Sequence, residues 1–189
     1  MDNQKKLEKI LLKNKLHLNL ENLNEAYINE VLLDIKNKDI YLKLISNKLI
    51  KEEEIDVLRR SLSRKFYKFD NVNISVLYDI KENDFQSIME DYWFNIVHII
   101  KSKIPSSSAW INDVKWNLID DSLILNSENE ISLYTLKQNG IEDKIEKKIN
   151  NEFKTEIKVK IDSDIKTSDI SNIDKEDFFI QKKKEEKTL

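Results

Sequence analysis

The stretch 26–31, Ala-Tyr-Ile-Asn-Glu-Val, returns as 109–114, Ala-Trp-Ile-Asn-Asp-Val, shifted by 83 positions (26 to 109). The same shift places further apolar residues on apolar residues, among them Leu33 on Trp116, Ile35 on Leu118, Ile40 on Leu123, Leu62 on Ile145 and Val76 on Val159. Since 40% of the residues are hydrophobic, chance alone would give an apolar match at about four positions in ten. The repeat is too long for one unit of a solenoid, and it predicts two diverged copies of a small domain.

Apolar periodicity predicts the same order of elements in both copies. In the first copy, alternation of apolar and polar residues predicts strands at 31–35, 40–44 and 72–80, with a hairpin turn at 37–39. Helical spacing of apolar residues predicts helices at 7–16, 23–29 and 55–66. In the second copy, we expect strands at 114–118, 123–125 and 157–161, and helices at 85–100, 107–110 and 130–153, the last broken at Gly140.

These patterns predict an α+β fold made of two tandem α-α-β-β-α-β domains, each a small three-stranded sheet covered by helices. The domains are expected at residues 1–81 and 82–162. Residues 163–189 alternate Asp with Ser, Thr and isolated Ile, and end in a run of Lys and Glu, which is typical of a charged flexible linker. A chain that stops inside such a linker is expected to be part of a longer protein.

Composition excludes several classes of protein. The net charge of −3 argues against a bulk nucleic-acid binder, which usually carries a basic domain. The chain has no Cys, so disulfides and thiolate metal sites are excluded, and a reducing cytosol is the natural compartment. No apolar stretch approaches the ~18 residues of a membrane span, and the N-terminus lacks the apolar core of a signal peptide. We therefore expect a cytoplasmic protein with no membrane partner.

No group of residues in the sequence has the pattern of a catalytic site. The two histidines, His17 and His98, are not equivalent in the repeat, and no second His lies one helical turn from either. The acidic pair Asp120 and Asp121 falls at a predicted hairpin turn, where Asp satisfies its own backbone. The single glycine, Gly140, excludes glycine-rich nucleotide loops and the Gly-x-x-Gly loop of KH domains. We expect no enzymatic activity, no cofactor, no metal and no small-molecule substrate.

A cluster of basic residues is the first candidate binding surface in the sequence. All three arginines of the chain lie within six residues on the predicted helix 55–66, in a chain otherwise rich in Lys. Arg is preferred over Lys where a carboxylate or phosphate is bound through two parallel hydrogen bonds. The cluster is a candidate partner-binding surface and consists of Arg59, Arg60, Arg64, Lys65 and Lys68. The alternative is a solvated helix face whose basic residues pair with the preceding glutamates at 52–54.

Aromatic residues form the second candidate surface. Every tryptophan lies in the second copy, and three aromatic residues are adjacent at 92–94. Because three adjacent side chains cannot share one helix face, Trp93 is expected in the core and Phe94 on another face. Phe94 and Trp116 are therefore candidate anchors for a partner, since aromatic residues dominate interface hot spots. The alternative is that these rings serve core packing.

The second copy resembles a known family of replication domains. The stretches that carry the resemblance are 107–111, Ser-Ser-Ala-Trp-Ile, 121–125, Asp-Ser-Leu-Ile-Leu, 129–130, Asn-Glu, and 157–161, Ile-Lys-Val-Lys-Ile. They are similar to domain I of the bacterial initiator DnaA and to the last domain of the clamp-loader tau subunit, both truncated KH-like modules. The two-copy arrangement resembles the N-terminal region of PolC-type DNA polymerase III alpha subunits, over residues 1 to 162.

The resemblance implies a non-catalytic module that docks a replisome protein, such as a clamp-loader, helicase or initiator component. The catalytic parts of such a polymerase would lie beyond Leu189, and none of their motifs occurs here. Two alternatives remain: weak binding of single-stranded DNA by a KH-like sheet, and a stand-alone adaptor of replication initiation. Binding of nucleic acid would weaken steeply with added salt, because phosphate contacts release counterions.

Overall fold

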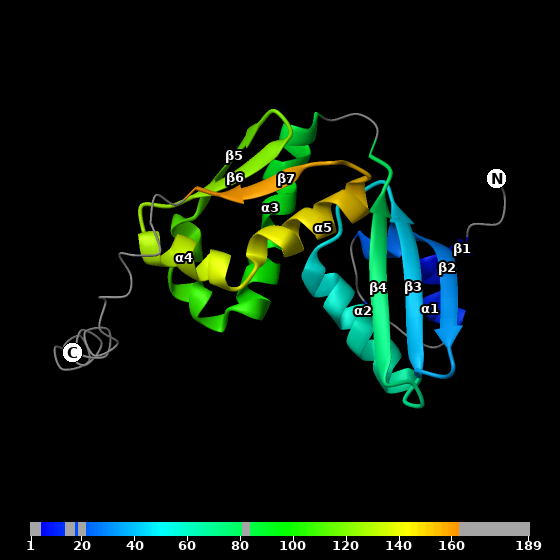
Figure 1. Cartoon of the computed structure of the whole chain (residues 1–189). Helices are drawn as coiled ribbons and strands as arrows, with labels where there is room; N and C mark the ends of the chain where they lie inside the picture. Colours follow the sequence, from blue (N-terminus) through cyan, green and yellow to red (C-terminus); the bar gives the residue numbers. More distant parts are fainter. Residues whose placement is uncertain (1–4, 14–17, 19–21, 81–83, 163–189) are drawn as a thin grey trace, which may run out of the picture.

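The computed structural model describes residues 5–13, 18, 22–80 and 84–162 (Figure 1). The predicted linker at 163–189 and His17 lie outside the described residues. Two sheets, each with its own helices, follow one another along the chain. We use "first unit" for β1 to β4 and "second unit" for α3 to β7. Among the described residues, no helix is long and apolar enough to cross a membrane.

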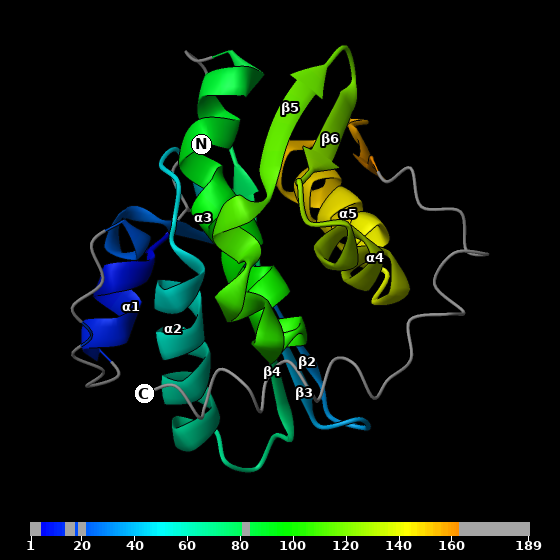
Figure 2. The ribbon, with the colours of Figure 1, turned by 90° about the vertical axis from the view of Figure 1, so that its left-hand side faces the viewer.

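The first unit is built around a hairpin and a parallel strand. Its elements are β1 (Lys5–Lys6), α1 (Leu7–Lys13), the 3-10 helix η1 (Leu23–Glu25), β2 (Tyr27–Asp34), β3 (Asp39–Ser46), α2 (Glu52–Lys65) and β4 (Asn71–Tyr78). The strand order is β1-β2-β3-β4, with β2 antiparallel and β4 parallel to β3. Helices α1 and α2 lie on the same side of this sheet (Figure 2). The alternating residues Ile40, Leu42 and Leu44 of β3 are buried as predicted.

The second unit repeats this path with an additional helix. Its elements are α3 (Phe85–Lys103), the 3-10 helices η2 (Pro105–Ala109) and η3 (Ile111–Asp113), β5 (Lys115–Ile119), β6 (Ser122–Asn126), α4 (Glu130–Gln138), α5 (Ile141–Phe153) and β7 (Lys158–Ile161). The sheet order is β5-β6-β7, again an antiparallel hairpin followed by a parallel strand. Asp84 caps α3 by accepting a hydrogen bond from Ser87 N at 2.8 Å. Gly140 adopts a left-handed backbone with φ 59° and separates α4 from α5, which confirms the predicted break.

The predicted α+β class is confirmed, with β1 added to the first sheet and α4 to the second unit. The uniform shift of 83 positions, however, does not hold along the chain. The stretch 26–31 enters strand β2, whereas 109–114 runs through η2 and η3. In the hairpins, Leu33 lies opposite Ile40 and Leu118 opposite Leu123, a shift of 85 (33 to 118), and the last strand is shifted further. Ile40 pairs with Val72 in the first sheet. The shift of 83 would pair Leu123 (40 + 83) with residue 155 (72 + 83), whereas Leu123 pairs with Val159, four positions later. The reason is the segment between the two parallel strands, which forms one helix in the first unit and two in the second.

The structure differs from two further patterns in the first unit. The helix expected at 23–29 is limited to η1, because the chain enters β2 at Tyr27. The alternating residues Val31, Leu33 and Ile35, which predict a strand at 31–35, are 52%, 57% and 82% exposed. Alternation gives the face of a strand but not whether that face is covered. Strand β1 pairs with only the first two residues of β2, so the remainder of β2 is an outer edge among the described residues.

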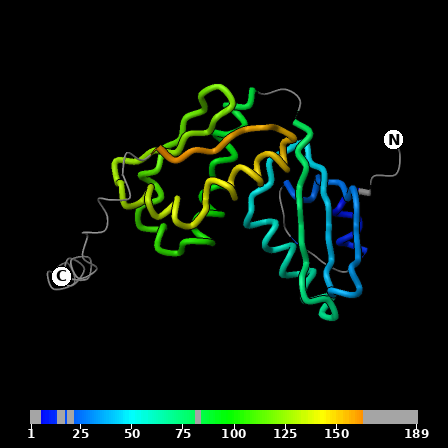
Figure 3. Tube along the Cα trace, viewed as in Figure 1, coloured from blue at the N-terminus to red at the C-terminus, as the bar shows by residue number. Residues whose placement is uncertain are grey.

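Aromatic rings join the two units. Tyr78, the last residue of β4, stacks on Phe153 of α5 with ring centroids 4.9 Å apart. Tyr92 of α3 meets Phe153 edge-on at 5.0 Å and Tyr78 at 6.2 Å. The Cα trace shows how α5 returns from the far side of the second unit to end beside β4 (Figure 3). Stacked and edge-to-face pairs add to the burial of the rings, so this cluster holds the units together.

A buried ionic network lies beside these rings. Tyr92 Oη donates to Glu152 Oε2 at 2.6 Å, and Lys148 Nζ lies 2.5 Å from Glu152 Oε1. Burial raises the pKa of the Glu152 carboxyl, an effect that the nearby Lys148 ammonium partly offsets. Burial, and then the Glu152 carboxylate, raise the pKa of the Tyr92 hydroxyl, which therefore remains a hydrogen-bond donor.

Candidate protein-interaction surface

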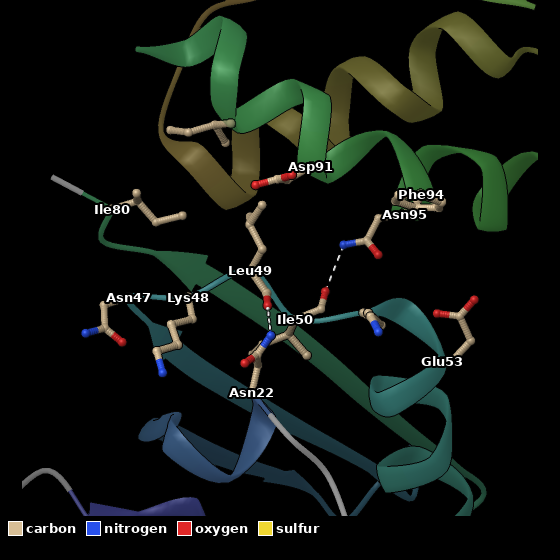
Figure 4. Close-up of a pocket in the computed structure, with 12 residues that line it drawn as sticks. Asn22, Asn47, Lys48, Leu49, Ile50, Glu53, Ile80, Asp91, Phe94 and Asn95 are labelled. Carbon is tan, nitrogen blue, oxygen red and sulfur yellow. Dashed lines mark hydrogen bonds between the residues drawn. The ribbon is translucent and has the colours of Figure 1, made fainter. Parts of the chain in front are cut away.

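A surface groove of about 760 Å³ opens where the loop between β3 and α2 meets helix α3 (Figure 4). The first unit contributes the backbone and side chains of Leu49 and Ile50, and the second contributes Ile88 and Phe94. We call this feature the junction groove. Its residues come from both units, so its shape depends on how the units pack.

Two asparagines hold the loop that lines the junction groove. Asn22 Nδ2 donates to Leu49 O at 2.8 Å from one side. From the other side, buried Asn95 donates through Nδ2 to Ile50 O at 2.8 Å and accepts from Glu52 N at 3.0 Å. An amide side chain can donate and accept at once, and Asn95 uses both capacities to join α3 to the start of α2. The groove is therefore preformed.

The aromatic residue among those that line the junction groove is Phe94. Its side chain is 75% exposed, whereas Trp93 next to it packs against the core. The structure thus places Phe94 on the outside of α3, as the sequence predicts. A large apolar ring exposed at the rim of an apolar groove has the chemistry of an interface anchor.

Lys48 and His98 make polar contacts beside the junction groove. Lys48 Nζ lies 2.8 Å from Glu25 Oε1, and this hydrogen bond lowers the pKa of the Glu25 carboxyl. His98 lies half-buried between two carboxylates of α2, with Nδ1 3.3 Å from Glu53 and Nε2 3.0 Å from Asp56. His98 therefore joins α3 to α2. Among the described residues, no cluster of His, Asp and Glu is arranged to hold a metal ion.

The basic cluster of α2 divides into two parts. Arg59 is half-buried and pairs with Asp56, so its charge is already balanced by a carboxylate of the same helix. Arg60, Arg64 and Lys68 are exposed, and none of them makes an ion pair with another residue in the described ranges. Lys65 is also exposed. The exposed part is the one available to a partner.

The cluster lies on a largely exposed helix face, as its alternative interpretation expects, but the glutamates at 52–54 have other partners. Glu52 pairs with Lys148 and Glu53 with His98, while Glu54 accepts a hydrogen bond from Leu23 N at 3.2 Å. Each of these carboxylates therefore makes its contact with another element instead of with the arginines of its own helix. Their roles depend on tertiary contacts that helical spacing alone does not show.

The exposed arginines continue the surface that starts at the junction groove. On α2, residues 56, 60 and 64 follow one another at i, i+4 spacing and lie on one side of the helix. Asp56 contacts His98, which lies one turn after Phe94 on α3. The chain thus presents an apolar groove with an aromatic rim, followed along α2 by Arg60 and Arg64.

Trp116 has a different environment. It is half-buried on β5, and its ring lies 6.1 Å from that of Trp93, tilted by 34°. This contact packs the second sheet against α3. The partner-binding role suggested for Trp116 stays a prediction.

The sequence did not identify the residues that shape the groove. Asn22, Leu49 and Asn95 gave no pattern typical of a site, and Leu49 lies in a loop. One signal was present for Asn95: an amide on the inward stripe of α3, between Tyr92 and Ile96, must be buried with a hydrogen-bond partner.

Comparison with protein-family models gives two matches. Residues 6–76 match the family described as DNA polymerase III polC-type N-terminus I, and residues 91–189 match DNA polymerase III polC-type N-terminus II. No curated protein and no solved structure matches the chain. The two matches follow the two units in order, and the second alone spans more than half of the sequence. The chain therefore belongs to the polC-type DNA polymerase III N-terminus family.

Proposed function

We propose that this chain is a non-catalytic docking module of a cytoplasmic replicative polymerase and binds another replisome protein through the junction groove. A clamp-loader, helicase or initiator component is the expected class of partner. The observation that carries the proposal is Phe94, 75% exposed on the rim of a groove whose backbone is fixed by asparagines from both units. A preformed apolar site with an exposed aromatic rim loses little conformational entropy on binding.

The residues of this surface also indicate which side chains the partner should present to it. Leu49, Ile80 and Ile88 line the junction groove and suit an apolar side chain. Arg60 and Arg64 continue from it along α2 and suit carboxylates. We therefore expect the partner to present an apolar anchor followed by acidic residues. Binding through the anchor should resist salt, and binding through the arginines should weaken with it.

Direct titration tests the proposal. Each candidate replisome protein is titrated against the chain by calorimetry, first with the wild type, then with Phe94→Ala and with Arg60→Glu combined with Arg64→Glu. We expect about tenfold or more weaker binding for Phe94→Ala, the loss typical of a hot-spot residue. Matched controls are Ile119→Ala, an exposed apolar residue on β5, and Lys160→Glu, an exposed basic residue on β7.

The proposal is judged by comparing the affinities of the test variants with those of the two control variants. Binding unchanged in Phe94→Ala, with a native circular dichroism spectrum, would remove the junction groove from the interface. Equal losses in the test and control variants would point to charge or stability effects without a defined site. Absence of binding to every clamp-loader, helicase and initiator component would contradict the proposed class of partner.

The exposed arginines Arg60 and Arg64 favour one second candidate, which is weak binding of single-stranded DNA. Arg60, Arg64 and Lys68 could contact phosphates as well as carboxylates. Such binding should fall steeply with salt and be lost in the charge-reversed variant. It should be retained in the control variants Ile119→Ala and Lys160→Glu, and a fluorescence titration without binding at low salt would exclude it.

A further inference from the structure

Within the described residues, the two sheets have long outer edges at β2, β4, β5 and β7, and these differ in how well they are protected from pairing with another strand. On β7, the outer amides are occupied: Val159 N donates to Glu146 Oε2 at 3.1 Å and Ile161 N to Glu142 Oε1 at 2.7 Å. On β4, alternate residues Asn71, Asn73 and Ser75 are exposed and polar. On β5, Lys115 and Asn117 interrupt the apolar residues. Polar and charged residues of this kind normally protect edge strands from pairing with other chains.

The outer edge of β2 lacks this protection at its centre. Lys5 and Lys6 of β1 pair with Ile28 and Tyr27, and from Asn29 onward no described residue pairs with this side of β2. The next residues are Val31, Leu32 and Leu33, each more than half exposed. Three consecutive exposed apolar residues place apolar side chains on both faces of the strand.

The register shows what surrounds this edge. Val31 and Leu33 lie opposite Leu42 and Ile40 of β3 and therefore point to the face of the sheet that carries the helices. Leu32 lies opposite Tyr41 on the open face. Beside it is a hollow of about 200 Å³, lined in part by Leu32, Tyr41 and Lys43. A strand added at this edge would bury apolar side chains on both faces.

We propose that the β2 edge, residues 30–34, is a second docking site that takes an extended segment of another protein as an additional strand. The edge has an apolar centre between two carboxylate residues: Glu30, which pairs with Lys43 at 2.9 Å, and Asp34, which accepts a hydrogen bond from Asn37 N at 2.9 Å. The matching segment is apolar opposite residues 31–33 and carries Lys or Arg at its flanks. Main-chain hydrogen bonds would supply affinity and the side chains specificity. This site is separate from the junction groove and does not depend on the function proposed for it.

A second copy of the chain fits the edge less well. The antiparallel register that overlaps all three apolar residues pairs Val31 with Leu33, and Leu32 with its own copy. In that register Glu30 of one copy lies opposite Asp34 of the other, twice. Like charges directly opposite each other on neighbouring strands are destabilising. The charges thus favour a foreign segment with basic flanks.

A synthetic peptide tests this proposal. The probe carries three central valines, flanked by threonines and terminal lysines, and the comparison peptide carries terminal glutamates instead. We expect the lysine peptide to bind more tightly and to slow amide hydrogen exchange in residues 30–34 of the wild-type protein. Leu32→Lys should weaken binding by about tenfold, a change of ~1.4 kcal/mol. Ile119→Lys on β5 is the matched control, and Phe94→Ala should bind the peptide as the wild type does.

Three results would overturn the proposal. The first is no binding of either peptide and no change in exchange at residues 30–34. The second is a wild-type dimer in light scattering that Leu32→Lys dissociates, which would make a second copy the occupant. The third is peptide binding only after removal of residues 1–4, which would make the chain's own N-terminus the occupant. Loss of binding in Leu32→Lys counts only with a native circular dichroism spectrum; Leu33→Lys provides a second variant.

Discussion

Lys148 Nζ, on α5 of the second unit, lies 2.5 Å from Glu52 Oε1, at the first residue of α2 in the first unit. The same ammonium group lies 2.5 Å from Glu152 Oε1. Both glutamates are buried. One lysine therefore balances two buried carboxylates from different units, and the nearby charges of Glu152 and Glu52 raise the pKa of Lys148 despite its burial. The ion pairs tie the packing of the units to this single cation.

Replacing Lys148 should destabilise the whole protein. In Lys148→Met, two buried carboxylates lose their cation, and we expect the free energy of unfolding to fall by about 3 kcal/mol, as for other broken buried ion pairs. Lys147→Met, an exposed lysine of the same helix, is the matched control and should have little effect. Urea denaturation monitored by circular dichroism measures both. Equal stabilities of the two variants would show that the pairing with Glu52 contributes nothing.

Two phenylalanines should separate stability from binding. Phe153→Ala removes a ring that contacts Tyr78, Tyr92 and Phe85, and we expect a loss of about 3 kcal/mol in the free energy of unfolding. Phe94→Ala removes an exposed ring and should change it by less than about 0.5 kcal/mol. Thermal and urea unfolding of the two variants test this contrast. A large loss of stability in Phe94→Ala would mean that Phe94 serves packing and cannot report on partner binding.

The sequence predicts elements whose pattern is local. The alternation of Ile40, Leu42 and Leu44 identifies a buried strand because β3 is paired on both sides and covered by helices. The same alternation at Val31 and Leu33 fails, because β2 is an edge strand and burial depends on neighbours that are distant in sequence.

The candidate surface is less predictable, because the junction groove depends on contacts between the units. The exposure of Phe94 follows from helix geometry and was predicted. The junction groove was not, since Asn22 and Asn95 lie far apart in the sequence and meet through one loop. Glu52 suits the positive end of a helix, but its burial requires Lys148, nearly a hundred residues away.

Lowering the pH should weaken the contact that Glu146 of α5 makes with Val159 and Lys158 of β7. The hydrogen bond from Val159 N, and then Lys158, lower the pKa of Glu146 below its ordinary value of 4.5. Ionised Glu146 therefore stabilises the fold above pH 4.5, and this contribution is lost as the pH falls through the lowered pKa. Glu146→Gln should be less stable than the wild type at neutral pH, and the difference should shrink in acid. Urea denaturation across this range tests the trend against Glu156→Gln, an exposed control. A constant difference would contradict it.

Two residues with left-handed backbone give predictions of opposite sign. Gly140 has φ 59° between α4 and α5, and a Cβ added there would meet no atom within 4 Å. Gly140→Ala should therefore cost only the intrinsic strain of this conformation, about 1 kcal/mol. Gly140→Asn should cost less, because Asn tolerates it better. Lys154 ends α5 with φ 56° and is exposed, so Lys154→Gly should stabilise the protein by about 1 kcal/mol.

Gly140→Ala and Lys154→Gly together measure the energetic cost of a left-handed backbone at a residue with a Cβ. Since neither position involves a crowded site, the changes in the free energy of unfolding should be opposite in sign and similar in size. Urea denaturation of Gly140→Ala, Lys154→Gly and the double variant measures them, and the effects should add because the residues lie at opposite ends of α5. Destabilisation by Lys154→Gly would show that the lysine side chain contributes more than its backbone strain costs. The left-handed end of α5 would then be held by that side chain.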